Sequence, residues 1–317
     1  MVVASGVRVA WVDLPAAVRA GVEDVLGSPV VGATTQTGGF SPGSADRVRT
    51  ADGRRAFVKA VSAEANEASP GLHRREGAVL GALPGDAPVP RLLGVHDDGT
   101  WVALVCSDVE GRHPALPWRS PELEATRAAY AVLTDVPVAG ALADLPGTGE
   151  QYAHDLAGWE RLLAEPDPDL DPWAATHLDR LATSAARSER VLEGDRLVHG
   201  DTRADNLLVR PDGDVVVVDW PWATRGPAWF DVVCLLINVT LNDPGAEVEE
   251  LVHRWLPEVA DEDVDTLLVG LAGYFVDVAR RPDPPGLPTV RAFQRAQGVA
   301  VLRWVRRRWA AAAADPR

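Results

Sequence analysis

The residues best suited to chemistry lie at positions 197–220. Two short apolar runs on either side of Asp212-Gly213 predict a β-hairpin, because Asp-Gly is a common two-residue turn. With such a turn, the register places Asn206 opposite Asp219, about 5 Å apart. An amide oxygen and a carboxylate at this separation suit Mg²⁺, which takes few protein ligands besides phosphate and water. The stretch therefore predicts a magnesium site.

Asp201 lies in the loop that enters this hairpin, five residues before Asn206. There it can stand beside the metal without being a ligand, which is where a base that accepts a hydroxyl proton is expected. The alternative is a hairpin that merely carries polar residues. Three polar residues at these offsets, two of them facing each other, favour the catalytic interpretation.

Lys59 stands at the end of a predicted strand and is the only lysine, since the other 30 basic residues are arginines. Lysine and arginine differ in shape and hydration, so its retention here suggests a chemical role. On the helix predicted next, Glu76 interrupts an apolar stripe formed by Leu72, Val79, Leu80 and Leu83. Burying an unpaired carboxylate is costly, so we expect Glu76 to pair with Lys59 unless it reaches water at the edge of the stripe.

A loop of small residues at 34–43, with Gly38, Gly39 and Gly43, precedes the strands that lead to Lys59. Glycines let backbone N–H groups approach a phosphate, although many hairpin loops are also rich in glycine. The chain has no G-x-x-x-x-G-K-[ST] segment, because its only lysine follows a valine. This excludes a P-loop nucleotide site.

The order Asp201-x-x-x-x-Asn206 and then Asp219 resembles the catalytic loop and metal-binding Asp of protein kinases. Two departures from that pattern are informative. Gly200 stands where protein kinases have Arg, and Trp220 follows the metal-binding Asp in place of Phe-Gly. Both features are similar to the aminoglycoside phosphotransferase and choline-kinase-like families.

The resemblance extends over about residues 31–240. It implies a two-lobed, protein-kinase-like α+β fold and an ATP- and Mg²⁺-dependent transfer of phosphate to an alcohol group. It also implies that His199 is structural and that Asp231 braces the catalytic loop. The implied site residues are Asp201 as the catalytic base, Asn206 and Asp219 as Mg²⁺ ligands, Lys59, Glu76, Gly38 and Gly39 at the phosphates, and the Ser107 carbonyl and Val109 N–H at adenine. A plain strand end is the alternative for the last two.

Periodicity and turn signals predict a strand-rich lobe and then a helical lobe. Residues 1–110 form the expected nucleotide-binding lobe, and residues 111–317 form the catalytic and acceptor-binding lobe. The predicted strands are at 45–50, 54–60, 91–95 and 101–106, with a hairpin at 207–219. The predicted helices are at 13–26, 71–83, 121–135, 150–164, 173–192, 228–241, 245–257, 262–279 and 288–314.

Composition narrows the function classes. A net charge of −15 disfavours binding to a nucleic-acid backbone. Cys106 and Cys234 are the only cysteines, too few for a disulfide framework or a zinc site. The N-terminus lacks a signal-peptide pattern and no apolar run approaches a membrane span, so we expect a soluble, cytoplasmic protein without a membrane partner.

The expected acceptor is a small hydroxyl compound. An antibiotic-modifying enzyme competes with a metabolic kinase for choline, a sugar or homoserine. A serine/threonine protein kinase and a silent nucleotide-binding module are less favoured. A cationic, aminoglycoside-like acceptor is our hypothesis because acidic residues gather in two groups. The groups are Asp144, Glu150, Asp155, Glu160, Glu165, Asp167, Asp169 and Asp171, and Glu247, Glu249, Glu250, Glu258, Asp261, Glu262, Asp263 and Asp265. A solvated acidic surface is the alternative.

Overall fold

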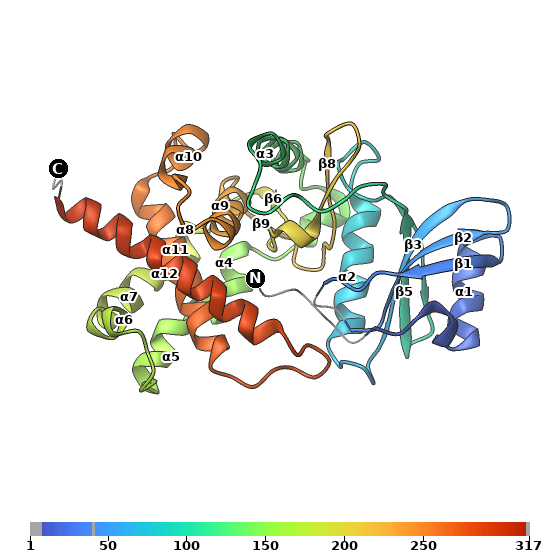
Figure 1. The fold of residues 1–317 in the computed structure, drawn as a ribbon, viewed down its shortest axis with the longest axis horizontal. Helices are drawn as coiled ribbons and strands as arrows, with labels where there is room; N and C mark the ends of the chain where they lie inside the picture. Colours follow the sequence, from blue (N-terminus) through green and yellow to red (C-terminus); the bar gives the residue numbers. More distant parts are fainter. Residues whose placement is uncertain (1–7, 40–41, 315–317) are drawn as a thin grey trace.

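The computed structural model describes residues 8–39 and 42–314, which form a sheet-containing lobe and a helical lobe (Figure 1). The sheet has five antiparallel strands in the order β1-β2-β3-β5-β4. They are β1 (Val30–Thr35), β2 (Ser44–Thr50), β3 (Arg55–Ser62), β4 (Leu92–Asp97) and β5 (Trp101–Ser107). The expected two-lobed α+β fold, with a small sheet lobe ahead of a larger helical lobe, is confirmed.

Alternation along the central strands gives the sheet two covered faces. Val58 of β3 packs in the cluster with α1 (Ala16–Leu26), whereas Leu104 of β5 packs in the cluster with α2 (Ser69–Ala82). The two helices lie on opposite sides of the sheet (Figure 1). Lys59 faces Leu104 across the β3–β5 ladder, so the pleat directs it to the α2 side.

The edge strand β1 was not predicted, and its last two residues, Thr34 and Thr35, were interpreted as the start of the small-residue loop. It pairs only with β2, for example Ala33 with Val48, and its register shifts between Val30 and Gly32. Gly32 and the two threonines at its end give a weak local signal for a strand. Pairing with the longer β2 supplies what local propensity lacks.

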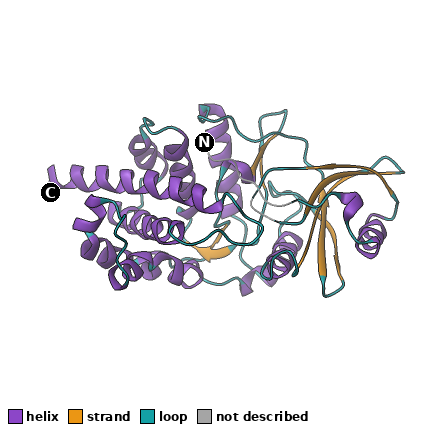
Figure 2. Ribbon diagram, turned by 60° about the horizontal axis from the view of Figure 1, so that its bottom comes forward, coloured by secondary structure: helices purple, strands orange, loops and turns teal. Residues whose placement is uncertain are grey.

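The helical lobe is built around α11, which contacts α4, α5, α7, α8 and α12. Trp159, Leu267 and Trp304 are fully buried in its core. The large sheet lies at one end of the molecule with helices beside it, and most of the helices gather at the other end (Figure 2). The helices are α3 (Ser120–Thr134), α4 (Thr148–Leu156), α5 (Gly158–Ala164), α6 (Pro172–Thr176), α7 (Leu178–Ala185), α8 (Ser188–Val191), α9 (Phe230–Asn242), α10 (Val248–Trp255), α11 (Asp261–Ala279) and α12 (Val290–Ala314).

Two stretches predicted as single helices are broken. Residues 150–164 form α4 and α5, and residues 173–192 form α6, α7 and α8. At the first break, a Cβ added to Gly158 would lie 2.2 Å from the carbonyl oxygen of Gly273. Close packing of α5 on α11 therefore requires a glycine, and the chain changes direction there. No helix in the described parts of the chain is long and apolar enough to cross a membrane.

The hairpin predicted in the catalytic segment is present as β7 (Leu207–Val209) and β8 (Val215–Val217). Its loop is longer than predicted, because the Arg210 N–H donates to the Asp214 carbonyl at 2.8 Å. Three residues, not two, separate these partners. A two-stranded ladder that was not predicted, β6 (Arg196–Val198) with β9 (Thr224–Gly226), brackets the segment.

The three-residue loop has a local cause. Pro211 favours the second position of a type I turn, and Gly213 closes the turn at φ 93°. The register therefore shifts by one residue, and the Val218 N–H donates to the Asn206 carbonyl at 2.9 Å. The predicted direct opposition of Asn206 and Asp219 is wrong. Asp219 instead lies one residue beyond the pair, with a left-handed φ of 71°.

Candidate active site

The expected Lys59–Glu76 pair is present. Nζ of Lys59 donates to both carboxylate oxygens of Glu76, at 3.0 and 2.8 Å. Glu76 is buried, and this burial raises its pKa against the opposing effect of Lys59. The contact joins β3 to α2, so it fixes the helix against the sheet.

The same ammonium group also bridges the two lobes. Lys59 Nζ donates to Oδ1 of Asp219 at 2.6 Å, although 160 residues separate the two in sequence. Burial disfavours the ammonium charge, but the charges of Asp219 and Glu76 raise the pKa of Lys59. Nearby His73 is held neutral, because burial and Lys59 lower its pKa to about 3. A single cation therefore lies between two carboxylates.

Asp231 fixes the entrance to the catalytic loop. It accepts hydrogen bonds from the N–H groups of His199 and Gly200, at 2.7 and 3.0 Å, and from the Thr202 hydroxyl at 2.9 Å. His199 packs edge-on against Trp220, and its Nε2 lies 3.1 Å from the Val218 carbonyl oxygen. These contacts give Asp231 and His199 the structural positions expected of them.

The carboxylate of Asp201 contacts two side chains of its own loop. Asn206 Nδ2 donates to Oδ2 at 2.9 Å and also to the Asp201 carbonyl. Arg203 Nη1 donates to both carboxylate oxygens, at 2.9 and 2.8 Å. Burial raises the pKa of Asp201, and Arg203 only partly opposes this effect. A carboxylate with a raised pKa is a stronger base than an exposed one.

Sequence analysis assigned no role to Arg203, although it places a guanidinium at the centre of the loop. Besides Asp201, it binds Asp205 through Nε and Nη2, both at 2.9 Å. It also lies over the ring of Phe293 of α12, 5.7 Å from the centroid. The pattern Asp-x-Arg-x-Asp was visible in the sequence, and a guanidinium fork matches two flanking carboxylates.

The residues at the lobe interface fit a divalent metal ion. With the amide nitrogen of Asn206 donating to Asp201, its Oδ1 remains available, as does Oδ2 of Asp219. The paired groups are four carboxylates, Glu76, Asp201, Asp205 and Asp219, and two cations, Lys59 and Arg203. At full charge these six groups sum to −2, and the charge of Arg8, which also acts on Asp219, offsets part of this. Among the described residues no group of three or more His, Cys, Asp or Glu could hold a metal, so phosphate and water would complete the shell.

The other residues expected at ATP, besides Lys59 and Glu76, lie in the sheet lobe or directly after its last strand. Gly38 and Gly39 lie between β1 and β2, in a loop whose residues 40 and 41 are outside the described part of the chain. Gly39 has φ 88°, and the Gly38 carbonyl accepts from Arg8. At the other end, Ser107 ends β5 and its N–H donates to the Arg91 carbonyl at 2.8 Å.

Val109 follows β5 on the way to the helical lobe. Its carbonyl oxygen lies 3.4 Å from Nη2 of Arg47, which also binds Asp108 at 2.9 Å. Its N–H has no hydrogen-bond partner among the described residues. The donor expected for adenine is therefore available, while the neighbouring backbone is fixed by an ion pair.

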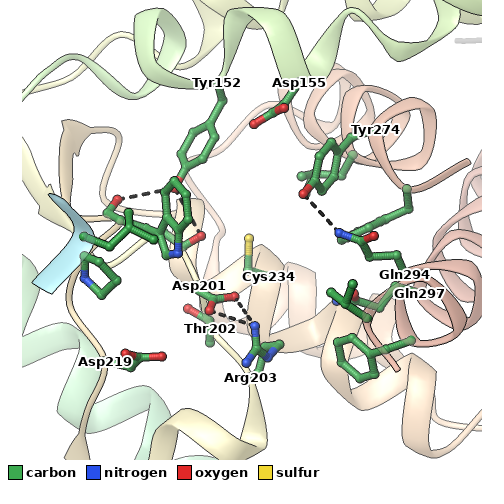
Figure 3. Close-up of a pocket in the computed structure, with 18 of the residues that line it drawn as sticks. Tyr152, Asp155, Asp201, Thr202, Arg203, Asp219, Cys234, Tyr274, Gln294 and Gln297 are labelled. Carbon is green, nitrogen blue, oxygen red and sulfur yellow. Dashed lines mark hydrogen bonds and ion pairs between the residues drawn. The ribbon is translucent and has the colours of Figure 1, made fainter. Parts of the chain in front are cut away.

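A cavity of about 330 Å³ opens between the lobes, beside the catalytic loop (Figure 3). Asp201, Arg203 and Asp219 lie at one side of it, and side chains from α2, α4, α9, α11, α12 and the connecting loops form the rest of its wall. From the two acidic groups proposed to attract a cation, only Asp155 lines this cavity. The cavity gives an acceptor direct access to the Asp201 carboxylate.

The chain is similar to solved phosphotransferases of low sequence identity. They include an aminoglycoside phosphotransferase from Alicyclobacillus acidocaldarius (17% identity, TM-score 0.54, covering 93% of this chain and 96% of that one). Another is the GDP and kanamycin complex of APH(2")-IIia (16%, 0.60, 92% and 97%). A third is APH(4)-Ia in a ternary complex with ADP and hygromycin B (15%, 0.58, 90% and 98%). At these identities the similarity shows a shared fold.

Sequence comparison gives the family directly. No curated protein matches the chain. The model of the phosphotransferase enzyme family matches residues 40–268, which include Lys59, Glu76 and the whole catalytic segment. Because this match covers well over half of the sequence, the chain belongs to the phosphotransferase enzyme family.

Proposed function

We propose that the chain transfers the γ-phosphate of ATP to a hydroxyl group of a small molecule. One observation carries this proposal: Lys59 of the sheet lobe contacts Glu76 and Asp219 together, next to the Asp201 carboxylate. We assign nucleotide binding to residues 1–110, and catalysis and acceptor binding to residues 111–317. The complexes of similar folds with ADP or GDP and an aminoglycoside support a nucleotide donor and a small acceptor.

On the nucleotide side, we assign Lys59 to the phosphates, with Glu76 holding its ammonium in place. The N–H groups of the loop at Gly38 and Gly39 would face the phosphates. The Ser107 carbonyl and the Val109 N–H would bind adenine. Lys59 has three N–H donors, and Glu76 already occupies part of them, so a phosphate would take the place of Asp219.

Release of Asp219 from Lys59 would leave its carboxylate beside the Asn206 oxygen. We assign these two side chains to Mg²⁺. When bound, the ion would neutralise negative charge on the transferring phosphate. The carboxylates of the cluster outnumber its cations, and this favours a divalent ion there.

Asp201 acts as the base in this proposal. As the acceptor oxygen forms a bond to the γ-phosphorus, its proton moves to the Asp201 carboxylate, and the bond from phosphorus to the β–γ bridging oxygen breaks with ADP as leaving group. Asn206 and Arg203 hold the carboxylate in one orientation. Bases positioned in this way contribute roughly 10²- to 10⁴-fold to rate.

Labelling of the only lysine tests the nucleotide site without any acceptor. A lysine-directed acyl phosphate of ATP can acylate only Lys59 and the N-terminal amine. We expect one internal labelled peptide, found by mass spectrometry, and protection of it by ATP with Mg²⁺. Labelling should be weaker in the Glu76→Gln variant, because the ammonium group of Lys59 is no longer held by a carboxylate. Equal labelling with and without ATP would place Lys59 outside the site.

A further inference from the structure

The cavity beside Asp201 has a wall of apolar and aromatic side chains. Tyr152 of α4 stacks on Phe230 of α9, with ring centroids 5.9 Å apart. Tyr274 and Phe275 of α11 lie next to each other on another part of the wall. The remaining apolar members include Trp222, Leu271, Leu287, Val290 and Phe293. Aromatic faces of this kind bind apolar rings and release water, and apart from the attraction of an ammonium group to a ring face they offer few hydrogen-bond partners to a ligand covered with amines and hydroxyls.

Two polar groups on this wall lack a partner among the described residues. The carboxylate of Asp155 makes no hydrogen bond or ion pair, and burial raises its pKa. The amide of Gln297 makes no hydrogen bond either, although the residue is only 9% exposed. Both line the cavity and are labelled in Figure 3. An amide and a carboxylate that line the cavity without a protein partner are available to hydrogen-bond a ligand there.

The other polar groups of the wall are already engaged. Tyr152 donates to the Gly200 or Trp222 carbonyl at 3.3 Å. Gln294 donates to the Tyr274 oxygen at 3.3 Å and accepts from Arg291 at 2.7 Å. This leaves the Tyr274 hydroxyl hydrogen as a further donor into the cavity.

Acidic residues of the two groups that lie outside the cavity do not act as individual ligands for a molecule inside it. Glu165 pairs with Arg280 and Asp171 with Arg306, both away from the cavity lining. A single arginine of α12 binds three members of the second group, Glu249, Asp261 and Asp265. Several of the carboxylates that suggested a polycation are therefore neutralised by arginines.

We infer that the acceptor has one amino group and a largely apolar body, with its amine at Asp155 and its hydroxyl at Asp201. This inference rests on the proposed function and names the substrate class of the same cavity. Asp155 supplies one charge-assisted hydrogen bond to the amine. Gln297 binds a polar substituent on the acceptor, and the aromatic wall binds its ring or hydrocarbon part.

The test compares matched acceptors. The panel contains aryl and alicyclic amino alcohols with a single amine, the N-acetylated counterpart of each, and kanamycin as a polycation. Phosphorylation is followed by ADP release and by mass spectrometry of the ester, and binding by calorimetry. Asp155→Asn removes the charge without changing size. Asp144→Asn, an exposed member of the same acidic group outside the cavity, is the matched control.

We expect single-amine compounds to have higher kcat/KM than both their acetylated counterparts and kanamycin. Asp155→Asn should lower kcat/KM for the amines by about tenfold, through KM, because a hydrogen bond to a charged group is lost. It should leave kcat/KM for the acetylated compounds and KM for ATP unchanged. Asp144→Asn should behave as wild type. Gln297→Leu should weaken the binding of the single-amine compounds and of their acetylated counterparts alike.

Three outcomes would overturn the inference. Preference for kanamycin over every single-amine compound would show a polycation site, and the kinase proposal would stand. If Asp155→Asn still prefers the single-amine compounds over their acetylated counterparts, the amine of the acceptor binds elsewhere. Absence of both binding and phosphorylation across the single-amine compounds would reject the substrate class. None of these removes the ATP protection of Lys59, so failure of the kinase proposal is detected separately.

Discussion

The catalytic cleft and helix α11 both contain buried carboxylates bound by arginine, in opposite proportions. In the cleft, Arg203 is shared between Asp201 and Asp205. On α11, the fully buried Asp277 is shared by three arginines, Arg161, Arg280 and Arg281. One cluster has a carboxylate in excess, and the other has cations in excess.

The pKa shifts follow these proportions. For Asp201, burial dominates and raises the pKa. For Asp277, burial acts in the same direction, but hydrogen bonds from Arg161 and Arg280 outweigh it and lower the pKa. The same residue types thus give a carboxylate with a raised pKa in one place and a carboxylate with a lowered pKa in the other. Burial, neighbouring carboxylates and the number of cationic partners together make the difference.

Neutralising Asp201 should have the largest effect on catalysis. Asp201→Asn keeps the shape of the side chain and loses the charge that takes the proton. We expect kcat to fall roughly 10²- to 10⁴-fold while ATP affinity stays nearly unchanged. The free energy of unfolding should fall by less than about 1 kcal/mol, because a carboxylate whose pKa is raised on folding destabilises the folded state at neutral pH, and Arg203 keeps its pair with Asp205. Turnover equal to wild type would remove Asp201 from the mechanism.

Asp277→Asn should give the reverse result, a large loss of stability with turnover preserved. Breaking a buried ion pair costs about 3–5 kcal/mol, and we expect the lower end because its arginines are partly exposed. Denaturant unfolding measures the loss, and kcat is compared at low temperature where the variant stays folded. Glu250→Gln, an exposed acid on α10, is the control and should change stability by less than about 0.5 kcal/mol. A kcat deficit in Asp277→Asn would make its cluster functional.

Asp219 shares features of both clusters, since it is paired with Lys59 and is also assigned to the metal. Asp219→Asn should weaken apparent Mg²⁺ affinity by roughly 10- to 100-fold, because a charged ligand is lost. Asparagine tolerates the left-handed φ of 71°, so the fold should persist. Asp219→Ala adds backbone strain, and Asn206→Ala should weaken Mg²⁺ less. Identical Mg²⁺ titrations of ATP turnover in variants and wild type would contradict the assignment.

Local patterns predicted much of this site. The Lys59–Glu76 pair followed from a carboxylate on an apolar stripe, and the roles proposed for Asp201, Asn206 and Asp219 followed from their spacing and its resemblance to that of protein kinases. The hairpin register failed by one residue, because the two-residue turn was chosen without weighing Pro211. Each of these inferences rests on residues close in sequence, where backbone geometry is most constrained.

The composition of the cavity wall could not be predicted from the sequence, for a physical reason. Gln297 and Tyr274 line the same cavity as Asp155 only because α11 packs against both α4 and α12, and α4 lies more than 100 residues away from both in sequence. The acidic groups looked alike in the sequence, yet packing places Asp155 in the cavity and others in arginine pairs. Tertiary packing, not composition, decides which carboxylates can meet a ligand.

Acid titration should separate the two clusters, with the smallest effect of the four tests. Asp201 must be ionised to act as a base. Its pKa is raised above the usual Asp value of about 3.9, so kcat/KM should begin to fall at a pH above that value. Asp277 has a lowered folded pKa, so its contribution to stability is fully present above about pH 3.9 and is lost as pH falls through its folded pKa below that value. Activity should therefore decline, reversibly, before this source of stability does. Profiles of kcat/KM and of denaturant unfolding against pH measure the two, with Asp277→Asn lacking its part of the acid loss of stability. If kcat/KM and stability decline over the same pH range in the wild type, and Asp277→Asn changes neither profile, the ratio of cations to carboxylates does not distinguish the clusters.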